Sequence, residues 1–398
     1  MQSRDASSTA PIDPTDALPE DATAATLVGR VWDPRHDGPS PVVIRNGTVH
    51  DVSDVFATVS EMFEQPDIVA ALAAAPPRPL GSVAEVLANA DPRSRDTGRP
   101  WLISPIDLQA VKAAGVTFAA SLMERVIEER AAGDPTAAAA VRDELMRVIG
   151  SDIRDVVPGS DAAMHLREVM ITDGTWSQYL EVGLGEDAEI FTKGQPLSTV
   201  GTGHDVGVLA SSEWNNPEPE VALVVSSSGR VVGATLANDV NLRDVEGRSA
   251  LLLGRAKDNN ASGAVGPFIR LLDDRFTIDD VRTLRVSLDV DGADGFALRA
   301  VSDMSLISRD PLELMRQLIG PHHAYPDGAL LMLGTMFAPT DDRDAPGRGF
   351  THHAGDVVRI SSPRLGTLQN TVRAAEDCEP WTFGIGALIR NLAERGLA

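Results

Sequence analysis

The spacing of apolar residues predicts helices in the first half of the chain and mostly strands in the second half. Residues 221–225 (Val-Ala-Leu-Val-Val) and 231–236 (Val-Val-Gly-Ala-Thr-Leu) are short apolar runs of the kind found in buried strands. Residues 121–132 and 135–149 carry apolar side chains at helical spacing, and the second stretch is rich in alanine. After residue 176, short strand-like runs alternate with Gly, Pro and Asp-Gly. The pattern indicates a fold that mixes both element types and is rich in strands.

The first hundred residues differ from the rest of the chain. Residues 1–22 are rich in Ser, Thr, Ala, Pro and Asp, and we expect them to form a mobile tail. Residues 23–100 are expected to form a small α+β domain, in which Asn46-Gly47 predicts a hairpin turn and residues 54–73 show helical spacing. Because 398 residues are many for a single core, residues 101–398 are expected to form a second, larger domain.

The composition indicates the compartment in which the protein acts and the classes of partner that it does not bind. A hydrophobic content of 43% is that of a globular protein, and no apolar run approaches the roughly 20 residues of a membrane helix. The N-terminus has no hydrophobic segment of signal-peptide type, and the single cysteine, Cys378, fits a reducing compartment. A formal net charge of −23 disfavours binding to nucleic acid or to anionic membranes. We therefore expect a cytoplasmic protein with neither nucleic-acid nor membrane partners.

Three acidic residues flank the two predicted strands described above. Glu218 and Glu220 are two positions apart, so their side chains point to the same face of an extended strand. Asp239, at the end of the second strand, can complete a cluster of three carboxylates. Such a cluster is costly to keep ionised and buried unless a divalent cation neutralises it. The sequence therefore predicts an oxygen-ligand site for Mg²⁺, with Mn²⁺ or Ca²⁺ as alternatives.

Lysine is rare in this chain, which makes the remaining lysines informative. Of 35 basic residues only Lys112, Lys193 and Lys257 are lysines. Where arginine is the usual cation, a retained lysine suggests that a compact point charge or a deprotonatable amine is required.

The order of these motifs resembles the fumarylacetoacetate hydrolase superfamily. The resemblance runs through Phe-Thr-Lys (191–193), Glu-x-Glu (218–220), Asn-Asp-Val-x-x-Arg-Asp (238–244), Lys257, Gly-Pro (266–267), Asp-Met (303–304), Gly-Thr (334–335), Gly-Asp-Val-Val (355–358) and Leu-Gly-Thr-Leu-Gln-Asn (365–370), over about residues 100–398. It implies an α+β, β-rich fold, a mixed β roll with a smaller N-terminal domain. It also implies that residues 101–398 are the catalytic domain, that the metal lies at one mouth of the β structure, and that the protein is a homodimer or homotetramer.

The resemblance assigns further site residues around a bound 2-oxo acid. A metal held by Glu218, Glu220 and Asp239 would chelate the acid through its carboxylate and keto oxygens and acidify the C3 protons. Lys257 is then expected to stabilise the enolate or to move a proton. Arg243 is expected to bind an anionic or hydroxyl group of the substrate, unless it only pairs with Asp244. Thr335 is expected to hydrogen-bond the substrate carboxylate, unless it is a strand-end hydroxyl.

One departure from the hydrolase pattern bears on the reaction. Family hydrolases carry His-x-x-Glu, a dyad that activates water, on a helix where this chain has Ser121-Leu-Met-Glu124. Without the imidazole that dyad is lost, while Glu124 can still accept and return a proton. Glu124 is therefore the expected proton carrier, with Ser121 facing the substrate. The alternative is that Glu124 is a solvated residue on a charged helix.

Four short segments of the sequence are similar to one branch of this superfamily, the 2-dehydro-3-deoxy-pentonate dehydratases of oxidative pentose catabolism. The matching segments are Trp-Ser-Gln-Tyr-Leu-Glu-Val (176–182), Glu-Trp-Asn-Asn-Pro-Glu-Pro-Glu (213–220), Lys-Asp-Asn-Asn-Ala-Ser (257–262) and Ser-Leu-Ile-Ser-Arg-Asp-Pro (305–311). The resemblance implies a lyase that converts a 2-keto-3-deoxy-pentonate, derived from D-xylonate or arabinonate, into 2,5-dioxopentanoate. Two alternatives stay open: a hydrolase of acylpyruvates or 2,4-diketo acids, and a catalytically silent ligand-binding protein. The stereochemistry at C4 and the choice of base between Lys257 and Glu124 also stay open.

The histidines form weaker patterns. His165-Leu-Arg-Glu168 imitates the dyad but lies outside the motif order, so we expect a structural role. The pairs His322-His323 and His352-His353 have no third ligand at zinc spacing, and His323 is a candidate only for lining the substrate pocket.

Overall fold

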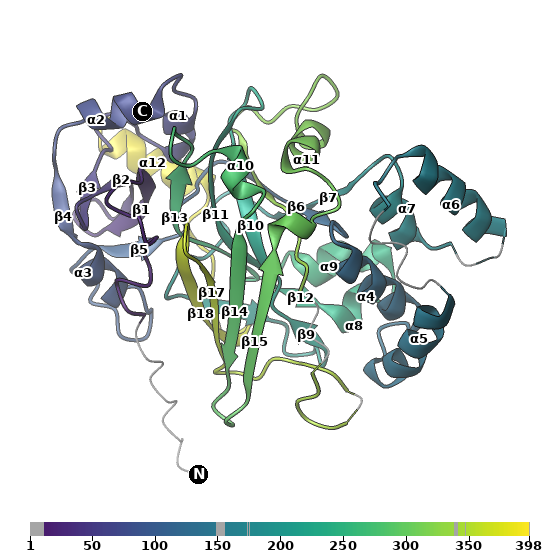
Figure 1. The fold of residues 1–398 in the computed structure, drawn as a ribbon. Helices are drawn as coiled ribbons and strands as arrows, with labels where there is room; N and C mark the ends of the chain where they lie inside the picture. Colours follow the sequence, from purple (N-terminus) through teal and green to yellow (C-terminus); the bar gives the residue numbers. More distant parts are fainter. Residues whose placement is uncertain are drawn as a thin grey trace, which may run out of the picture.

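Two β-sheets pack face to face at the centre of the protein (Figure 1). This computed structural model describes residues 12–148, 156–172, 174, 176–337, 341–346 and 348–397. Within these residues the larger sheet has eleven strands. Its order is β4 (Pro79–Ser82), β3 (Thr48–Asp51), β2 (Gly38–Arg45), β1 (Leu27–Asp33), β13 (Gly263–Leu271), β11 (Val231–Asp239), β10 (Pro219–Val225), β16 (Ala329–Met332), β6 (Ala110–Gly115) and β7 (Glu189–Gly194), with β5 (Trp101–Ile103) paired to β1.

The second sheet has five strands and lies against the middle of the first. Its order is β15 (Ala297–Asp303), β14 (Arg285–Asp291), β17 (Val357–Ser362), β18 (Gly366–Ala374) and β8 (Asp205–Val208). A two-stranded ladder joins β9 (Asn215–Asn216) to β12 (Asn241–Leu242). Most pairings are antiparallel, but β16–β6 and β18–β8 are parallel. The mixed, β-rich α+β architecture confirms the predicted fold class.

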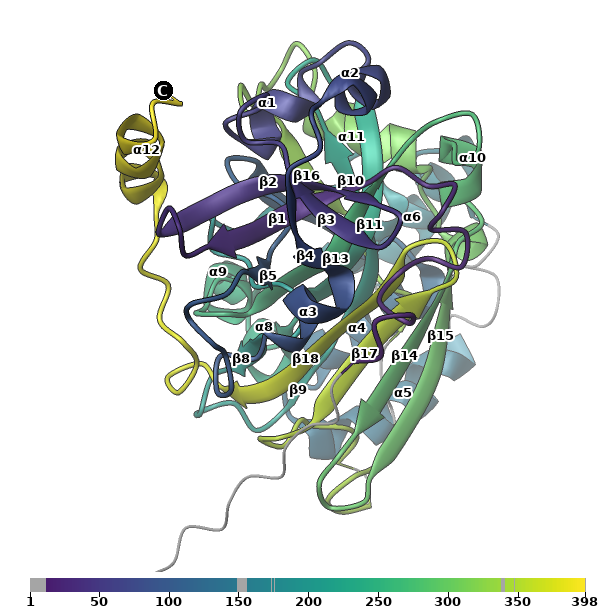
Figure 2. The same cartoon turned by 90° about the vertical axis from the view of Figure 1, so that its left-hand side faces the viewer.

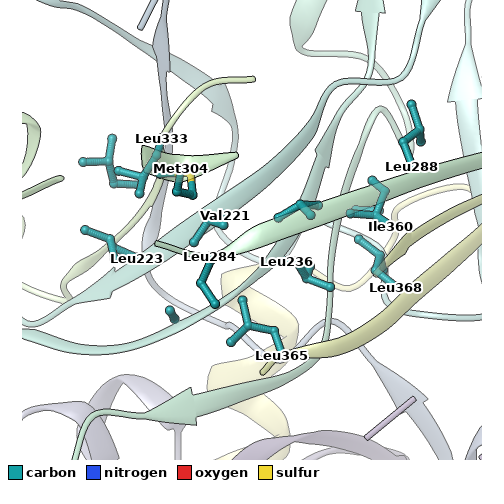
Figure 3. Packing of buried hydrophobic residues seen from close by; sticks show 14 of the residues in the cluster. Val221, Leu223, Leu236, Leu284, Leu288, Met304, Leu333, Ile360, Leu365 and Leu368 are labelled. Atoms are coloured by element: carbon teal, nitrogen blue, oxygen red, sulfur yellow. The ribbon is translucent and has the colours of Figure 1, made fainter. Parts of the chain in front are cut away.

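The central strand β10 is apolar after Glu220 because both of its faces are covered. Val221 and Leu223 belong to the core between the two sheets, which also contains Leu288 and Ile360 of the second sheet (Figure 3). Ala222 and the other residues of opposite parity belong to a second core on the outer face of the large sheet. A strand buried on both sides loses the alternation of polar and apolar residues and becomes a continuous apolar run.

Helices cover the edges and one end of the sheets. They are α1 (Val59–Phe63), α2 (Ile68–Ala74), α3 (Val83–Ala88), α4 (Ala119–Arg130), α5 (Pro135–Val148), α6 (Asp161–Thr172), α7 (Gln178–Leu184), α8 (Arg243–Glu246), α9 (Leu253–Lys257), α10 (Ile278–Val281), α11 (Pro311–Leu318) and α12 (Ile385–Glu394). Helices α4 to α9 gather on one side of the sheets, opposite the N-terminal segment (Figure 1). Among the described residues, no helix combines the length and the apolar character needed to cross a membrane.

Most predicted elements are present. The strands predicted at 221–225 and 231–236 are β10 and β11, and the helix predicted at 121–132 is α4. The helix predicted at 135–149 is α5, although residue 149 lies outside the described residues. The hairpin at Asn46-Gly47 is confirmed, because both residues have positive φ between the paired strands β2 and β3.

The single helical stretch expected over 54–73 is wrong. The structure has two short helices there, α1 and α2, separated by the segment that contains Pro66. Proline lacks the amide hydrogen that a continuing helix needs, and it disfavours helical geometry in the residue before it. Asp67 then caps α2 by accepting a hydrogen bond from the Ala70 amide at 2.9 Å.

The N-terminal segment joins the main sheet. Strand β1 pairs with β2 and also with β13, so residues 27–51 extend the large sheet. Residues 1–11 of the expected tail lie outside the described residues. Residues 12–22 pack against the protein: Ala17 is fully buried, and Asp21 pairs with Arg270. The packed chain therefore begins before residue 23, while the domain boundary near residue 100 stays a prediction.

Asp21→Asn is expected to destabilise the protein. Arg270 is buried and donates to both Asp21 oxygens, at 2.6 and 2.7 Å. Removing the carboxylate charge leaves a buried guanidinium without its counter-ion, and we expect a loss of about 1–2 kcal/mol because Asp21 itself is partly exposed. The Arg270 hydrogen bond lowers the pKa of Asp21, so this stabilisation is present at neutral pH and disappears as the pH falls through that lowered value. Denaturant melts of the variant and of the exposed control Asp16→Asn measure the effect. Equal stability of the two variants would contradict it.

Candidate active site

Three buried carboxylates converge where β10 begins and β11 ends. Glu220 continues the parity of Ala222 along β10, and Glu218 precedes it by two residues. The antiparallel register brings the end of β11 beside Glu218, and the Asp239 amide donates to the Glu218 carbonyl at 3.0 Å. One oxygen from each carboxylate lies within 4.8 Å of the others. The geometry predicted from the strand pattern is therefore present.

Two lysines form ion pairs with these carboxylates. Lys257, the last residue of α9, donates to Glu218 Oε2 at 2.6 Å and to Asp239 Oδ2 at 3.1 Å. Lys193 Nζ lies 2.9 Å from Asp239 Oδ1 and also donates to the Lys257 carbonyl at 2.7 Å. Two of the three lysines in the chain thus lie at the carboxylate cluster.

Electrostatics favour the charged form of Lys257. Burial by itself disfavours the ammonium, but the neighbouring carboxylates Asp239 and Glu218 outweigh it and raise the pKa of Lys257 above its ordinary value. A lysine in this state is a point charge and not a base. The arrangement therefore favours charge stabilisation as the role of Lys257.

The three carboxylates have the character of a divalent-cation site. Burial, together with the charges of Asp239 and Glu218, raises the pKa of Glu220 well above its ordinary value. A cation with oxygen preference would remove this penalty, and Mg²⁺ prefers carboxylate oxygens. Asn216 lines the same cavity, and its buried Oδ1 has no hydrogen-bond partner. The residues present therefore fit such an ion.

Gly334 fixes one of the carboxylates. Its amide donates to Glu220 Oε2 at 2.6 Å. Gly334 has a φ of +89°, and a Cβ at this position would collide with the hydroxyl of Thr117. Glycine is required at this position because only glycine adopts this backbone geometry without strain and leaves room for Thr117.

Helix α4 places the two residues of the altered dyad at the same cavity. Ser121 is buried, and its hydroxyl donates to the Phe118 carbonyl at 2.9 Å. Glu124 accepts hydrogen bonds from Arg142 at 2.7 Å and from Arg243 at 3.2 Å. Its side chain is only 13% exposed, so the alternative of a solvated helix residue is wrong.

Arg243 belongs to a buried network and does not pair with Asp244. It donates to Glu128 at 2.6 Å and to Glu124, and its guanidinium lies 4.2 Å from the ring centre of Trp214. Asp244 instead accepts from Ser212 and from the Glu213 amide.

All eight predicted site residues line one cavity, which contains Ser121, Glu124, Glu218, Glu220, Asp239, Arg243, Lys257 and Thr335. Thr335 follows Gly334, and its hydroxyl oxygen accepts the Phe337 amide at 3.0 Å. None of the described residues that line this cavity is a histidine. His323 packs on Tyr325 outside it, and His352 pairs with Asp356 at 3.2 Å. His165 lies in α6, also outside the cavity.

Sequence reasoning missed several residues of the cavity. Arg125 on α4 bridges Glu218, Glu128 and Glu246, with distances of 2.7 Å to Glu128 and 2.8 Å to Glu246. The sequence marks Arg125 only by its position next to Glu124, in a helix that contains several other charged residues.

Glu189 is the second missed residue. It is the first residue of β7, lines the cavity, and has its carboxylate directly above Gly115. Burial, followed by the charge of Glu246, raises the pKa of Glu189 to about 7. Nothing in the sequence around Glu189 marks it, because its neighbours in the cavity come from distant segments.

Comparison with known proteins gives one family and two groups of relatives. Residues 180–373 match the family described as fumarylacetoacetate (FAA) hydrolase C-terminal. A probable 2-keto-3-deoxyxylonate dehydratase of Haloferax volcanii is 30% identical over 194 residues, which cover 49% of this chain and 63% of that protein. A 2-dehydro-3-deoxy-D-arabinonate dehydratase of Saccharolobus solfataricus is 31% identical over 185 residues, which cover 46% of this chain and 58% of that protein. The chain thus spans less than two thirds of the length of these curated relatives.

Solved structures extend the likeness in fold to most of the chain. The apo form of a 2-keto-3-deoxy-D-arabinonate dehydratase has a TM-score of 0.60 at 21% identity, covering 87% of this chain and 99% of that chain. The same enzyme complexed with magnesium and 2,5-dioxopentanoate has the same score, identity and coverage. At this identity the likeness shows the fold.

Proposed function

We propose that this chain, whose residues 180–373 belong to the fumarylacetoacetate hydrolase family, is a Mg²⁺-dependent dehydratase of 2-keto-3-deoxy-pentonates. The substrate would derive from D-xylonate or arabinonate, and the products would be 2,5-dioxopentanoate and water, as in oxidative pentose catabolism. One observation carries the proposal: a three-carboxylate site lies in one cavity with a charged lysine and further carboxylates, and none of the described lining residues is a histidine. The names of the curated relatives and of the solved structures support the same reaction.

Glu218, Glu220 and Asp239 would hold the cation, which when bound supplies Lewis-acid polarisation of the 2-oxo group. We propose Mg²⁺ as the resident ion, with Mn²⁺ or Ca²⁺ as substitutes. Lys257, held as an ammonium beside two of these carboxylates, places its positive charge where negative charge develops on the substrate oxygen.

Other residues orient the substrate. Arg243 is held at the cavity by Glu124, Glu128 and Trp214, and we assign its positive charge to the binding of an anionic or hydroxyl group of the sugar acid. Thr335 and Ser121 also line the cavity, and we assign the Thr335 hydroxyl to the substrate carboxylate and Ser121 to a contact with the substrate. These roles are proposals that follow from position.

Four further carboxylates line the cavity, and we assign proton transfer to two of them, Glu189 and Glu124, because Glu128 and Glu246 are ion-paired with Arg125. Loss of water requires removal of a C3 proton and protonation of the leaving C4 hydroxyl, which leaves a C3–C4 double bond. A proton then moves from C5 to C3, and the resulting C4–C5 enol becomes the aldehyde. A group with a pKa near the working pH can both accept and donate protons in such a series. Glu189 meets this condition. Glu124, which Arg142 and Arg243 hold in place, is the second carboxylate that we assign to this work.

Glu189→Gln is expected to lower kcat by about 10²–10³-fold, because an amide cannot carry the proton. In the wild type, the ionised form that removes the C3 proton is lost as the pH falls below about 7, so kcat/KM should fall there. In Glu189→Gln, kcat/KM should not show this fall at low pH. Glu124→Gln is the matched comparison, since it also converts a lining carboxylate into an amide. Exchange of C3 protons with deuterated solvent should stop in Glu189→Gln and continue in Glu124→Gln. Exchange that stops only in Glu124→Gln would make Glu124 the base.

Two alternatives are tested by the same substrate panel. Purified protein with and without Mg²⁺ is incubated with 2-keto-3-deoxy-pentonates of both C4 configurations and with an acylpyruvate, while the aldehyde and pyruvate formed are quantified. The dehydratase proposal expects aldehyde from at least one pentonate. Faster release of pyruvate from the acylpyruvate would favour a hydrolase. Mg²⁺ binding without any turnover would favour a silent binding protein.

We also propose a homodimer or homotetramer located in the cytoplasm. The family resemblance supports the assembly, and the single cysteine, which is buried and unpaired, supports a reducing compartment. Light scattering of the purified protein would give its mass in solution.

A further inference from the structure

A second cavity, separate from the candidate active site, opens beside β1 and β5. Its volume is about 320 Å³, while one buried water needs only about 15 Å³. Its walls include Trp32, Trp101 and Phe383, and none of its lining residues belongs to the active-site cavity. The segment between β18 and α12, which contributes Trp381, crosses this side of the molecule (Figure 2). The space is therefore large enough for a small organic molecule.

An arginine without an ion pair lies in the wall of this cavity. Arg30 is only 4% exposed, its Nε donates to the Ser104 carbonyl at 2.9 Å, and its Nη1 has no hydrogen-bond partner. Among the described residues, no carboxylate comes within 4.0 Å of its guanidinium nitrogens, although the charge of Asp107 acts on it. Asp107 itself accepts hydrogen bonds from the amides of Val59 and Ser60. A buried cation in this situation is complemented by an anion.

The other charges around the cavity are already balanced. Arg95 reaches Glu379 at 3.5 Å, and Asp205 lies 3.0 Å from Arg373. Burial lowers the pKa of His204 to about 4, so this histidine is neutral. Arg30 is thus the lining charge that lacks a close partner.

Aromatic rings form the apolar part of the wall. Trp32 stacks on Trp101 with ring centres 5.8 Å apart, and Phe383 meets Trp32 edge-on at 5.0 Å. Trp381 stands at the rim with 46% of its surface exposed. Rigid aromatic walls with one or two polar groups are typical of small-molecule sites.

We propose that this cavity binds a small organic carboxylate, with the carboxylate directed at Arg30 and an apolar body against Trp32, Phe383 and Trp381. The ligand class follows from the aromatic wall and from a buried guanidinium with which no described carboxylate forms a close ion pair. A divalent cation or an organic cation is positively charged, as Arg30 is, and would be repelled by it. This site is independent of the proposed dehydratase reaction.

Phenylacetate is a suitable probe because it has one carboxylate, one ring and no 2-oxo group that would chelate a metal. Titration of the full-length protein, with metal removed by chelator, is followed by tryptophan fluorescence and calorimetry. Of the five tryptophans, Trp32, Trp101 and Trp381 line the cavity, so saturable quenching is expected. Phenylacetamide has the same shape without the charge, and its affinity should be at least about tenfold lower. Equal affinity for the amide would overturn the proposal.

Variants locate the binding. Trp381→Ala should weaken phenylacetate binding about fivefold or more through lost apolar contact at the rim, and Arg30→Lys more strongly. Ile389→Ala removes an exposed apolar residue of α12 outside the cavity and is the matched control. Because Arg30 is buried, its substitution also affects folding, whereas Trp381 is exposed at the rim and tests the site by itself. Unchanged affinity in Trp381→Ala, or no saturation by phenylacetate in the wild type, would contradict the site.

Discussion

Lys257→Met is expected to reduce kcat by about 10²–10³-fold while Mg²⁺ binding is kept or strengthened. The ammonium lies 2.6 Å from Glu218 and 3.1 Å from Asp239, so it neutralises the same carboxylates that a metal would use. Its removal abolishes charge stabilisation during the reaction. It also removes a cation that repels the metal, so affinity for Mg²⁺ should not fall.

The measurement combines turnover on a 2-keto-3-deoxy-pentonate with calorimetry of Mg²⁺. Lys112→Met is the matched control, because Lys112 donates to Thr192 and does not line the active-site cavity. Without Mg²⁺ the Lys257 variant should also melt at lower temperature, since Glu218 and Asp239 each lose one of their close cations. Turnover equal to that of the control would show that the lysine is only structural.

Glu220→Gln is expected to lower Mg²⁺ affinity by about 100-fold or more and to abolish turnover, because it removes one of three charged ligands. Burial and the charges of Asp239 and Glu218 raise the pKa of Glu220 well above its ordinary value, and a bound cation would favour its ionised form. Mg²⁺ binding to the wild type should therefore release more protons than Mg²⁺ binding to the variant. Calorimetry in two buffers of different ionisation enthalpy measures this number directly.

The same raised pKa predicts how metal-free stability depends on pH. In the unfolded chain Glu220 ionises near its ordinary value, while in the folded chain it holds its proton to higher pH. Its contribution to stability is complete below the unfolded pKa and is lost as the pH rises through the folded pKa. Saturating Mg²⁺ should remove this loss. Glu213→Gln, an exposed residue of the same motif, is the control and should behave like the wild type. A metal-free melting temperature that rises steadily with pH in the wild type would contradict the account.

The carboxylate site was predictable because its geometry is nearly local. Glu218 and Glu220 share a face through the two-residue period of a strand, and Asp239 lies on the adjacent strand, joined by a short hairpin. Side chains alternate between the two faces of a strand, and the short hairpin fixes how β10 and β11 pair. Together these constraints place the three carboxylates close to one another. The fold class was predictable for a related reason, since the apolar runs of β10 and β11 are strong signals of buried strands.

Two segments were mispredicted, because a single residue or a distant contact outweighed the average pattern of the segment. Residues 54–73 keep helical spacing, but Pro66 divides them into α1 and α2. Residues 12–22 have a composition typical of a tail, yet Asp21 is held by Arg270, which is 249 positions away in the sequence. A composition average does not detect one ion pair to a distant buried arginine.

The sequence by itself determined the buried strands, the carboxylate cluster on them, the retained lysine and the loss of the imidazole dyad, because each depends on residue type and short-range spacing. Only the tertiary structure decided that Lys257 is a fixed cation, that Arg125 bridges Glu218 to Glu246, and that Glu189 faces the same cavity. These depend on burial and on the packing of α4, α8, α9 and β7, which come from separate parts of the chain. Charge state depends on the sum of nearby charges and on exclusion of water, and neither quantity exists until those segments are packed together.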